Sequence, residues 1–213
     1  MPLTVKQSDI NRFERLVAKL TKSSENPTIC FIPSNTGTLK LCAFAKDAIL
    51  TMTVSKQGFV DTFALSAVSL KTFAAKKGSD VILTPQKDAV HVQQGEEQRW
   101  LPREKQVNTL PNCPKQTATN DKRLLDVLHQ SARCADPANV KTALNGLCLR
   151  GATSQILGTS GVQLVVHEHF AFPWKEDVIT PASKLFGTKE LKEIDTDEVL
   201  LGQINDWVYC RSG

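Results

Sequence analysis

Two segments of the chain, 118 residues apart, match each other over 16 positions without a gap. They are "DVILTPQKDAVHVQQG", residues 80–95, and "EVLLGQINDWVYCRSG", residues 198–213. Each carries Asp at its ninth position (Asp88, Asp206) and Val at its eleventh (Val90, Val208), and each ends in Gly. Both read as two strand-like runs joined by a turn. An internal repeat constrains the fold strongly, because it predicts two copies of one structural unit.

The match extends upstream of these hairpins. The runs "DINRFERLVAKL" and "NDKRLLDVLHQSA" have the apolar periodicity of amphipathic helices, with Asp9 and either Asn120 or Asp121 as predicted N-caps. Strand-like runs follow, "TLKLCAFA" and "AILTMTV" in one half, "LNGLCLRG" and "QLVVHEH" in the other. A second helix is predicted in "LSAVSLKTFAAKK" and in "TPASKLFGTKELKE". The order helix, strands, helix, strands occurs twice and indicates an α+β fold.

The repeat also predicts where the chain divides. The run "NTLPNCPKQTATN", residues 108–120, is rich in Pro, Asn and Thr, as linkers are. We therefore expect a complete domain over residues 1–112 and a second domain over residues 113–213. In the first half "QRWLP" adds one more strand to the hairpin, whereas the second half stops at the counterpart of Gly95. The second domain is expected to lack its closing strand and a third domain to be absent, so the chain is either cut short or a short natural variant.

A tandem repeat of this size, with two helices and several antiparallel strands per unit, resembles the DNA sliding clamps. The bacterial DNA polymerase III beta clamps are the most similar. The resemblance covers residues 3–213, and its most specific parts are "VKTALNGLCL" at 140–149 and "ILGTSGVQLVV" at 156–166. It implies the DNA clamp fold, with helices lining a ring of six domains, and a non-enzymatic protein without cofactors. It also implies a homo-oligomeric ring when full length, which encircles duplex DNA in the cytoplasm, associated with the nucleoid.

Basic residues gather on the predicted helices. Sliding along DNA requires a positive lining that contacts phosphates without reading sequence. On the first helix, four basic residues fall within an arc of about 80°, away from the apolar face. The residues predicted to contact DNA are Arg12, Arg15, Lys19, Lys22, Lys71, Lys76, Lys77, Lys122, Arg123, Arg133, Lys141, Lys184 and Lys189. An ordinary solvated helix face is the alternative for any one helix, and the net charge of +4 does not decide between the two.

The resemblance also implies a cleft for the peptide tails of polymerases and clamp loaders. The matching positions are Leu144, Thr159, Gly161, Val162, Gln163 and Leu164. Three residues depart from the family pattern: Ser160 replaces an acidic residue, Val162 a His and Gln163 an Arg. The other side of the cleft would come from a third domain. A plain turn is the alternative for this stretch, and a clamp-fold interaction module that no longer encircles DNA is the alternative for the whole chain.

No constellation typical of an enzyme occurs in the sequence. There is no Gly-x-Ser-x-Gly elbow, and "SNTGTLK" lacks the Gly-Lys-Ser/Thr ending of a phosphate loop. In "HEH", His167 and His169 would share one side of a strand and could begin the metal site of a small hydrolase; solvent-facing histidines are the alternative, and no metal is predicted. The six cysteines form no C-x-x-C pair; they are expected to be reduced, and most of them to be buried. No apolar run approaches the roughly 20 residues of a membrane span.

Overall fold

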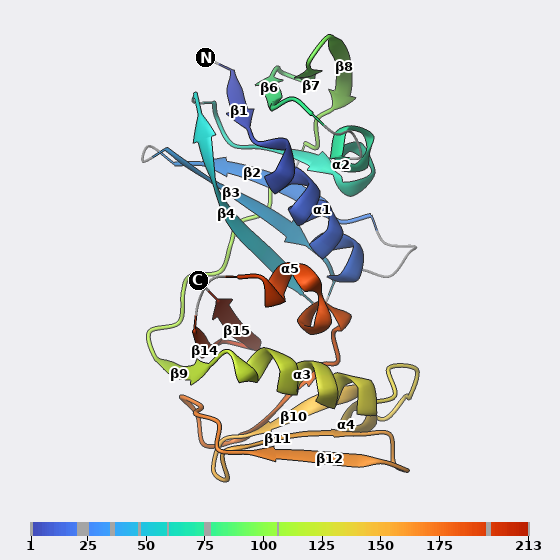
Figure 1. Ribbon diagram of the computed structural model, residues 1–213, viewed down its shortest axis with the longest axis vertical. Coiled ribbons are helices and arrows are strands. Elements are labelled where there is room, and N and C mark those ends of the chain that lie inside the picture. Colours follow the sequence, from blue (N-terminus) through green and yellow to red (C-terminus); the bar gives the residue numbers. More distant parts are fainter. Residues whose placement is uncertain are drawn as a thin grey trace. The chain divides into compact units, whose positions relative to one another are not determined.

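The computed structural model describes residues 2–20, 26–34, 37–46, 48–58, 60–74, 78–105, 107–194 and 197–212. The chain forms two compact units, Met1–Thr109 and Leu110–Gly213. In each unit the longest helix lies across one face of antiparallel sheet, which gives the α+β fold that the sequence predicts (Figure 1). Residues 107–116, which include the predicted boundary after residue 112, contain no helix or strand.

The first unit consists of two helices, each followed by strands as the repeat predicts, and of one strand before the first helix that was not predicted. Its elements are β1 (Leu3–Val5), α1 (Gln7–Leu20), β2 (Thr28–Pro33), β3 (Thr38–Phe44), β4 (Ile49–Gln57), β5 (Phe63–Ser66), α2 (Ala67–Ala74), β6 (Val81–Pro85), β7 (Ala89–Gln94) and β8 (Glu97–Pro102). Within the described residues these strands form one eight-stranded sheet in the order β5-β2-β3-β4-β1-β6-β7-β8. The predicted additional strand in "QRWLP" is β8, at one edge of this sheet.

The second unit repeats this order with several differences. Its elements are β9 (Thr117–Asp121), α3 (Arg123–Cys134), α4 (Thr142–Asn145), β10 (Gly146–Arg150), β11 (Gln155–Thr159), β12 (Leu164–Glu168), β13 (Asp177–Pro181), the 3-10 helix η1 (Lys184–Gly187), α5 (Lys189–Lys192), β14 (Glu198–Ile204) and β15 (Trp207–Ser212). The predicted second helix is broken into η1 and α5. The strands described here form two sheets, β12-β11-β10-β13 and β15-β14-β9, in place of one.

The two closing hairpins have the same register. Val81 pairs with Gln94 in β6–β7, and Val199 pairs with Ser212 in β14–β15, each residue of the second pair standing 118 positions after its counterpart. Every pair of the first ladder recurs in the second with this shift. The predicted repeat is therefore confirmed at the level of individual residue pairs.

Other elements recur at a slightly shorter spacing. The pair Phe44–Ile49, which flanks the β3–β4 turn, corresponds to Thr159–Leu164 of β11–β12, 115 residues later. The β1 and β9 strands are related by the same shift, since each pairs with the first strand of its closing hairpin. The shift of 115 residues identifies the counterpart of any residue in β1, β3 or β4.

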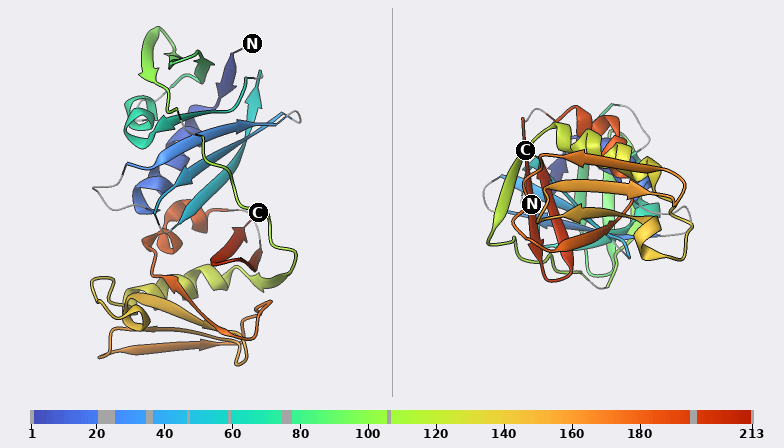
Figure 2. Two further views of the ribbon diagram at one scale, coloured as in Figure 1. Left: turned by 180° about the vertical axis from the view of Figure 1, so that it is seen from behind. Right: turned by 90° about the horizontal axis from the view of Figure 1, so that it is seen from below.

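The apolar faces of the long helices build the two cores. In the first unit Phe13 of α1 is fully buried, as are Phe31 and Phe63, whose rings stack with centroids 4.6 Å apart. In the second unit Leu124 and Leu128 of α3 are buried over the four-stranded sheet. Figure 2, right, shows the face of this sheet that α3 does not cover. Burial along one side of each helix accounts for the apolar periodicity of both runs.

The predicted N-caps are wrong, because short strands precede both helices. Helix α1 begins at Gln7, so Asp9 lies in its first turn, where partial burial raises the pKa of the carboxyl group. The N-cap residue of α3 is Lys122, without a capping hydrogen bond from its side chain. Asn120 instead hydrogen-bonds to the backbone of Ala171.

The second unit has a split sheet because β12 is shorter than its counterpart β4. In the first unit Val5 of β1 pairs with Lys56 of β4, which joins the strands into one sheet. The counterparts are Asn120 and Ala171, and here a side chain replaces the backbone ladder. The Asn120 amide donates to the Ala171 carbonyl at 2.9 Å and accepts from the Ala171 N–H at 2.8 Å. The Asn120 side chain thus makes the two hydrogen bonds that link the two sheets at this position.

Candidate functional site

Helix α1 carries the predicted basic face, opposite its buried side. Ile10, Phe13 and Val17 are buried, whereas Arg15 and Lys19 are exposed. Arg12 is half-buried at the border of the same face. Packing of one side of the helix against the sheet therefore leaves its cations toward solvent, in positions where they could contact phosphate groups.

The second helix of this unit extends the basic face. Helix α2 packs beside α1 and exposes Lys71. Lys22, Lys76 and Lys77, which were predicted to contact DNA, lie outside the described residues. No helix of the described residues is long and apolar enough to cross a membrane.

The helices of the second unit carry a more mixed set of charges. Arg133 is exposed on α3, but the acidic Asp126 is exposed on the same face, seven residues earlier. Lys184 of η1 and Lys189 of α5 are exposed, and the Lys189 ammonium lies 3.3 Å from the Glu193 carboxylate. The last predicted cation, Lys141, is exposed immediately before α4. The positive face predicted for this unit is therefore weaker than that of α1.

Two of the predicted DNA contacts have roles inside the second unit. The Lys122 ammonium donates to the carbonyl of Ile194 at 2.7 Å and so ties the start of α3 to the segment before β14. Gln7, at the start of α1, accepts from the Gly78 N–H at 3.0 Å and makes the corresponding tie in the first unit. The Arg123 guanidinium lies 5.3 Å from the centre of the Phe170 ring and faces β12. The sequence did not reveal either role, because each depends on a residue far along the chain.

The predicted peptide cleft coincides with the β11–β12 turn. The Thr159 hydroxyl donates to the Gln163 carbonyl at 2.7 Å and accepts from the Gly161 N–H at 3.0 Å. Gly161 has a φ of +88°, which favours glycine, and its α-carbon faces the side chain of Leu144. Two hydrogen bonds of Thr159 thus hold the turn, and Leu144 lies beside Gly161, another of the predicted cleft positions.

Apolar side chains stand exposed at this turn. Val162 is 94% exposed and Leu164 is 63% exposed. Exposed apolar residues in a rigid turn are suited to contact a partner, since they lose little conformational freedom when they bind. The turn therefore presents exposed apolar side chains at two of the predicted cleft positions.

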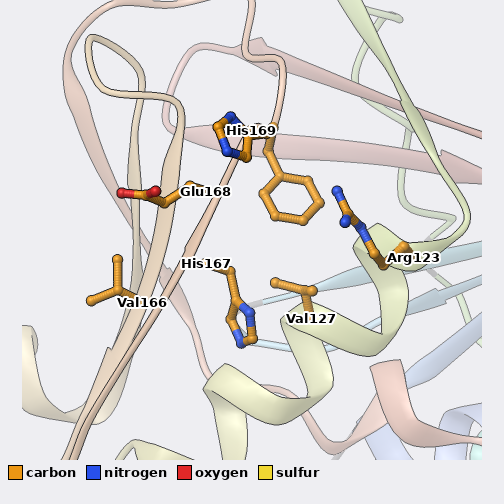
Figure 3. A pocket seen from close by; sticks show the side chains of 7 residues that line it. Arg123, Val127, Val166, His167, Glu168 and His169 are labelled. Atoms are coloured by element: carbon orange, nitrogen blue, oxygen red, sulfur yellow. The ribbon is translucent and has the colours of Figure 1, made fainter.

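The two histidines of "HEH" do not share one side of a strand. Strand β12 ends at Glu168, and His169 has a φ of 72°, which turns the chain away (Figure 3). His167 points toward Val127 of α3, and its Nε2 is buried without a hydrogen-bond partner among the described residues. Over the same residues, no three His, Cys, Asp or Glu side chains gather as a metal site would require.

All six cysteines are free thiols, as expected, but only Cys30 and Cys42 are buried. Burial raises the pKa of both thiols, that of Cys42 to about 12. Both are therefore protonated at neutral pH and act as small apolar residues of the first core.

This arrangement of helices and sheets, occurring twice in one chain, is the fold of the DNA sliding clamps. In particular it is the fold of the bacterial DNA polymerase III beta subunits. The chain aligns with that subunit from Pseudomonas aeruginosa with a TM-score of 0.78 and 18% identity, over 100% of this chain and 62% of that one. It aligns with the Helicobacter pylori beta clamp bound to a DNA ligase peptide with a TM-score of 0.77 and 17% identity, over 100% and 64%. The Thermotoga maritima beta subunit gives 0.75 and 16%, over 99% and 61%.

The likeness to the clamps lies in the fold. No protein-family model matches the chain, and no curated protein matches its sequence. The chain spans less than two thirds of the length of the clamps that it resembles. The predicted resemblance and fold class are thereby confirmed.

Proposed function

We propose that this chain is a sliding-clamp-like tethering factor, which binds duplex DNA without sequence preference and recruits polymerase or repair proteins. The observation that carries the proposal is the exposed basic face of α1 (Arg12, Arg15, Lys19) on a clamp fold. Duplex DNA carries one negative charge per about 1.7 Å, and a helix of 14 residues is about 21 Å long. Cations along one such helix can therefore contact several phosphates at once, with no contact to base edges.

We propose that duplex DNA is encircled by an assembly of several chains. The resemblance implies six such domains in a ring, and one chain contains two units. We propose that a homo-oligomeric ring forms through strand edges that are open within the described residues, among which are those of β8, β12 and β15. The protein would then act without catalysis and without a cofactor, on nucleoid DNA in the cytoplasm.

Removing the basic face of α1 should weaken binding to DNA of any sequence. The variant Arg12→Ala/Arg15→Ala/Lys19→Ala loses three phosphate contacts. The slope of log K against log salt should then become shallower by about 2.7, since each contact contributes about 0.9. Fluorescence anisotropy with two duplexes of unrelated sequence, at several salt concentrations, measures this slope.

A matched control removes the same charge from another surface. Lys40, Lys87 and Lys105 are exposed and lie outside the helices of the first unit. Lys40 lies on β3 between two buried residues, so its side chain is on the side of the sheet away from α1. Replacing these three with Ala should leave most of the slope intact. Equal slopes for both triple variants would mean that α1 does not form the DNA site.

The exposed apolar turn favours a second candidate function, a clamp-fold module that binds proteins and does not encircle DNA. Val162 and Leu164 are accessible to a peptide, whereas the basic face of the second unit is mixed. The DNA ligase peptide bound by the Helicobacter pylori clamp is the natural probe for this site. Peptide binding without salt-dependent DNA binding would favour this candidate over the first.

Charged residues at the turn should abolish peptide binding. In Leu144→Asp/Leu164→Asp, two carboxylates would occupy the apolar wall, and desolvating them would cost more than the contact gains. Isothermal titration with the ligase peptide should show binding to the unchanged chain, at least tenfold weaker binding to this variant, and none of a scrambled peptide. If the unchanged chain does not bind the ligase peptide, the turn is not a site for this peptide.

A further inference from the structure

The four-stranded sheet of the second unit carries a row of apolar side chains on the face that α3 does not cover (Figure 2, right). Leu147, Leu149 and Ile156 point into the core, so the residues between them along each strand point to the opposite face. Four such residues, one from each strand, pair with one another across the sheet: Val166, Leu157, Cys148 and Ile179. Val166 is 42% exposed, Ile179 is 45% exposed, and the two residues between them are half-buried. A contiguous row of accessible apolar side chains is typical of an interaction surface.

The same row in the first unit is buried. Cys42 of β3 stands 115 residues before Leu157 and is its counterpart. From Cys42 the cross-strand pairs continue to Cys30 and then to Ala64, in the order found in the second unit. All three are 0% exposed, although it is their neighbours along the strands that form the core beneath α1. A part of the chain other than a helix therefore covers them.

The chain that follows β8 covers this row in the first unit. We call residues 103–105 and 107–109 the strap; they contain no helix or strand. The Glu104 N–H donates to the Ala64 carbonyl at 2.9 Å, on the edge strand β5. The Cys30 thiol donates to the Asn108 carbonyl at 3.9 Å. The strap therefore binds the edge of the sheet and then lies across the row (Figure 2, left).

The second unit adds a carboxylate at the place where the strap binds through its cation. In the first unit the Arg103 guanidinium donates to the carbonyl of Thr62 at 3.2 Å. Thr62 stands two residues before the buried row, and the residue in this place in the second unit is Asp177. The Asp177 carboxylate lies 3.3 Å from the Arg150 guanidinium, and both side chains are more than 40% exposed. Because an exposed ion pair contributes little, Asp177 can bind a second cation.

The size of this face favours a peptide over a second copy of the chain. Four strands about 4.8 Å apart, each of five residues about 3.3 Å long, cover about 300 Å². A stable dimer buries about 800 Å² on each partner. Strand β13 is at an edge of the sheet within the described residues, so a peptide can hydrogen-bond there as Glu104 does at β5. The strap of this chain already covers the first unit, which favours a segment of another protein.

We propose that this face of the second unit binds a non-helical segment of a partner protein in the way that the first unit binds the strap. The partner segment would place a basic residue beside Asp177, donate a backbone N–H to the Ile179 carbonyl and lie across Cys148 and Leu157. The site is separate from the basic face of α1 and from the apolar β11–β12 turn. It therefore depends neither on DNA binding nor on the ligase peptide.

Titration of the full chain with a peptide of the strap sequence, followed by nuclear magnetic resonance, tests the proposal. The probe is Arg-Glu-Lys-Gln-Val-Asn-Thr-Leu-Pro, residues 103–111, acetylated and amidated at its ends. Saturable shifts are expected at the amides of Leu157, Cys148 and Ile179, with a dissociation constant of about 1 mM. A peptide of the same composition in scrambled order should cause no such shifts.

Two variants of the chain test the row and the carboxylate separately. Ile179→Asp should bind the probe at least tenfold more weakly, because the new carboxylate would be desolvated in the apolar row. Val162→Asp, which places the same charge on the exposed turn, is the matched control and should bind as the unchanged chain does. A probe with Gln in place of its Arg should bind the unchanged chain about threefold more weakly, whereas Asp177→Asn should bind the two probes equally.

The proposal is overturned by an absence of shifts, or by shifts confined to Val162 and Gln163 of the turn. Shifts at Cys30 and Ala64 in place of the row would overturn it too, because the probe would then displace the strap of the first unit. If the amides of the row shift without the probe as the protein concentration rises, the face belongs to a second copy of the chain. Equal binding of the probe by Ile179→Asp and by the unchanged chain would mean that the row is not the site.

Discussion

Replacing Gly158 with Ala should destabilise the second unit by about 3 kcal/mol or more, because the new methyl group would overlap the backbone of α3. Gly158 lies on β11, and a β-carbon there would collide with the carbonyl oxygen of Ser131. A backbone atom cannot move aside as a flexible side chain can, so the helix must shift from the sheet. Thermal unfolding should show a midpoint lower by about 12 °C or more for a unit of this size.

The first unit shows why this position is demanding. Its counterparts of Gly158 and Ser131 are Ala43 and Leu16, both buried. Small residues on both the strand and the helix thus replace larger ones in the second unit, where the helix contacts the strand backbone directly. An alanine that fits between α1 and β3 is therefore expected not to fit between α3 and β11.

Gly161→Ala is the matched control for the collision. Gly161 belongs to the turn that follows the same strand, and a β-carbon there would make only ordinary contacts with Leu144. Its positive φ should cost about 1 kcal/mol. Equal losses for the two variants would mean that α3 does not sit on β11 as closely as described, and hydrogen exchange of the α3 amides would show whether the helix has moved.

The regular parts of this fold could be predicted because they are periodic. The apolar spacing in α1 and α3 reflects burial of one helix side, and the alternation in the closing hairpins reflects one buried sheet face. The strands β1 and β9 were missed, and no strand was predicted for β2, β5, β11 or β13. Three residues, Leu3–Val5, are too few to show alternation, and β9 reads as a polar linker. The false N-caps follow directly from these missed strands.

The candidate site was predictable in its charges but not in its contacts. Arg15 and Lys19 are exposed as the helical period requires, whereas the Lys122 ammonium donates a hydrogen bond to a carbonyl 72 residues away. The turn at His169 could not be predicted either, since a positive φ is uncommon outside glycine. Contacts of this kind follow from the tertiary structure and leave no period in the sequence.

The two candidate functions depend on different surfaces, one on the basic faces of the helices and the other on the apolar β11–β12 turn. A clamp that slides requires weak, exchangeable phosphate contacts around the whole duplex, so a mixed charge on α3 would have to be offset by other helices of the ring. An interaction module requires only the apolar turn. The salt slope of DNA binding therefore separates the functions.

Replacing Asn120 with Val, its counterpart in the first unit, should destabilise the second unit by about 2–3 kcal/mol. Asn120 is 8% exposed, and its amide satisfies both the N–H and the carbonyl of Ala171. Valine can satisfy neither, so the Ala171 N–H and carbonyl would lose the hydrogen bonds that they make here. Chemical denaturation measures the loss. A loss below about 0.5 kcal/mol would mean that the strands close into a ladder after all.

The change Asn120→Asp should cause a loss that depends on pH. A carboxylate can accept from the Ala171 N–H, but it would face the Ala171 carbonyl with no proton to donate. Burial and this contact would raise the folded pKa of the new carboxyl above its unfolded value of about 3.9. The protonated acid donates to the carbonyl as the amide does, so the variant should approach the stability of the unchanged chain below about pH 4 and lose it as the pH rises through the folded pKa. Asn120→Val introduces no titrating group, so its loss of stability should be the same below pH 4 and at neutral pH. If the loss for Asn120→Asp is equally constant, Ala171 does not take its hydrogen bonds from this side chain, and the bridge between the two sheets must be sought elsewhere.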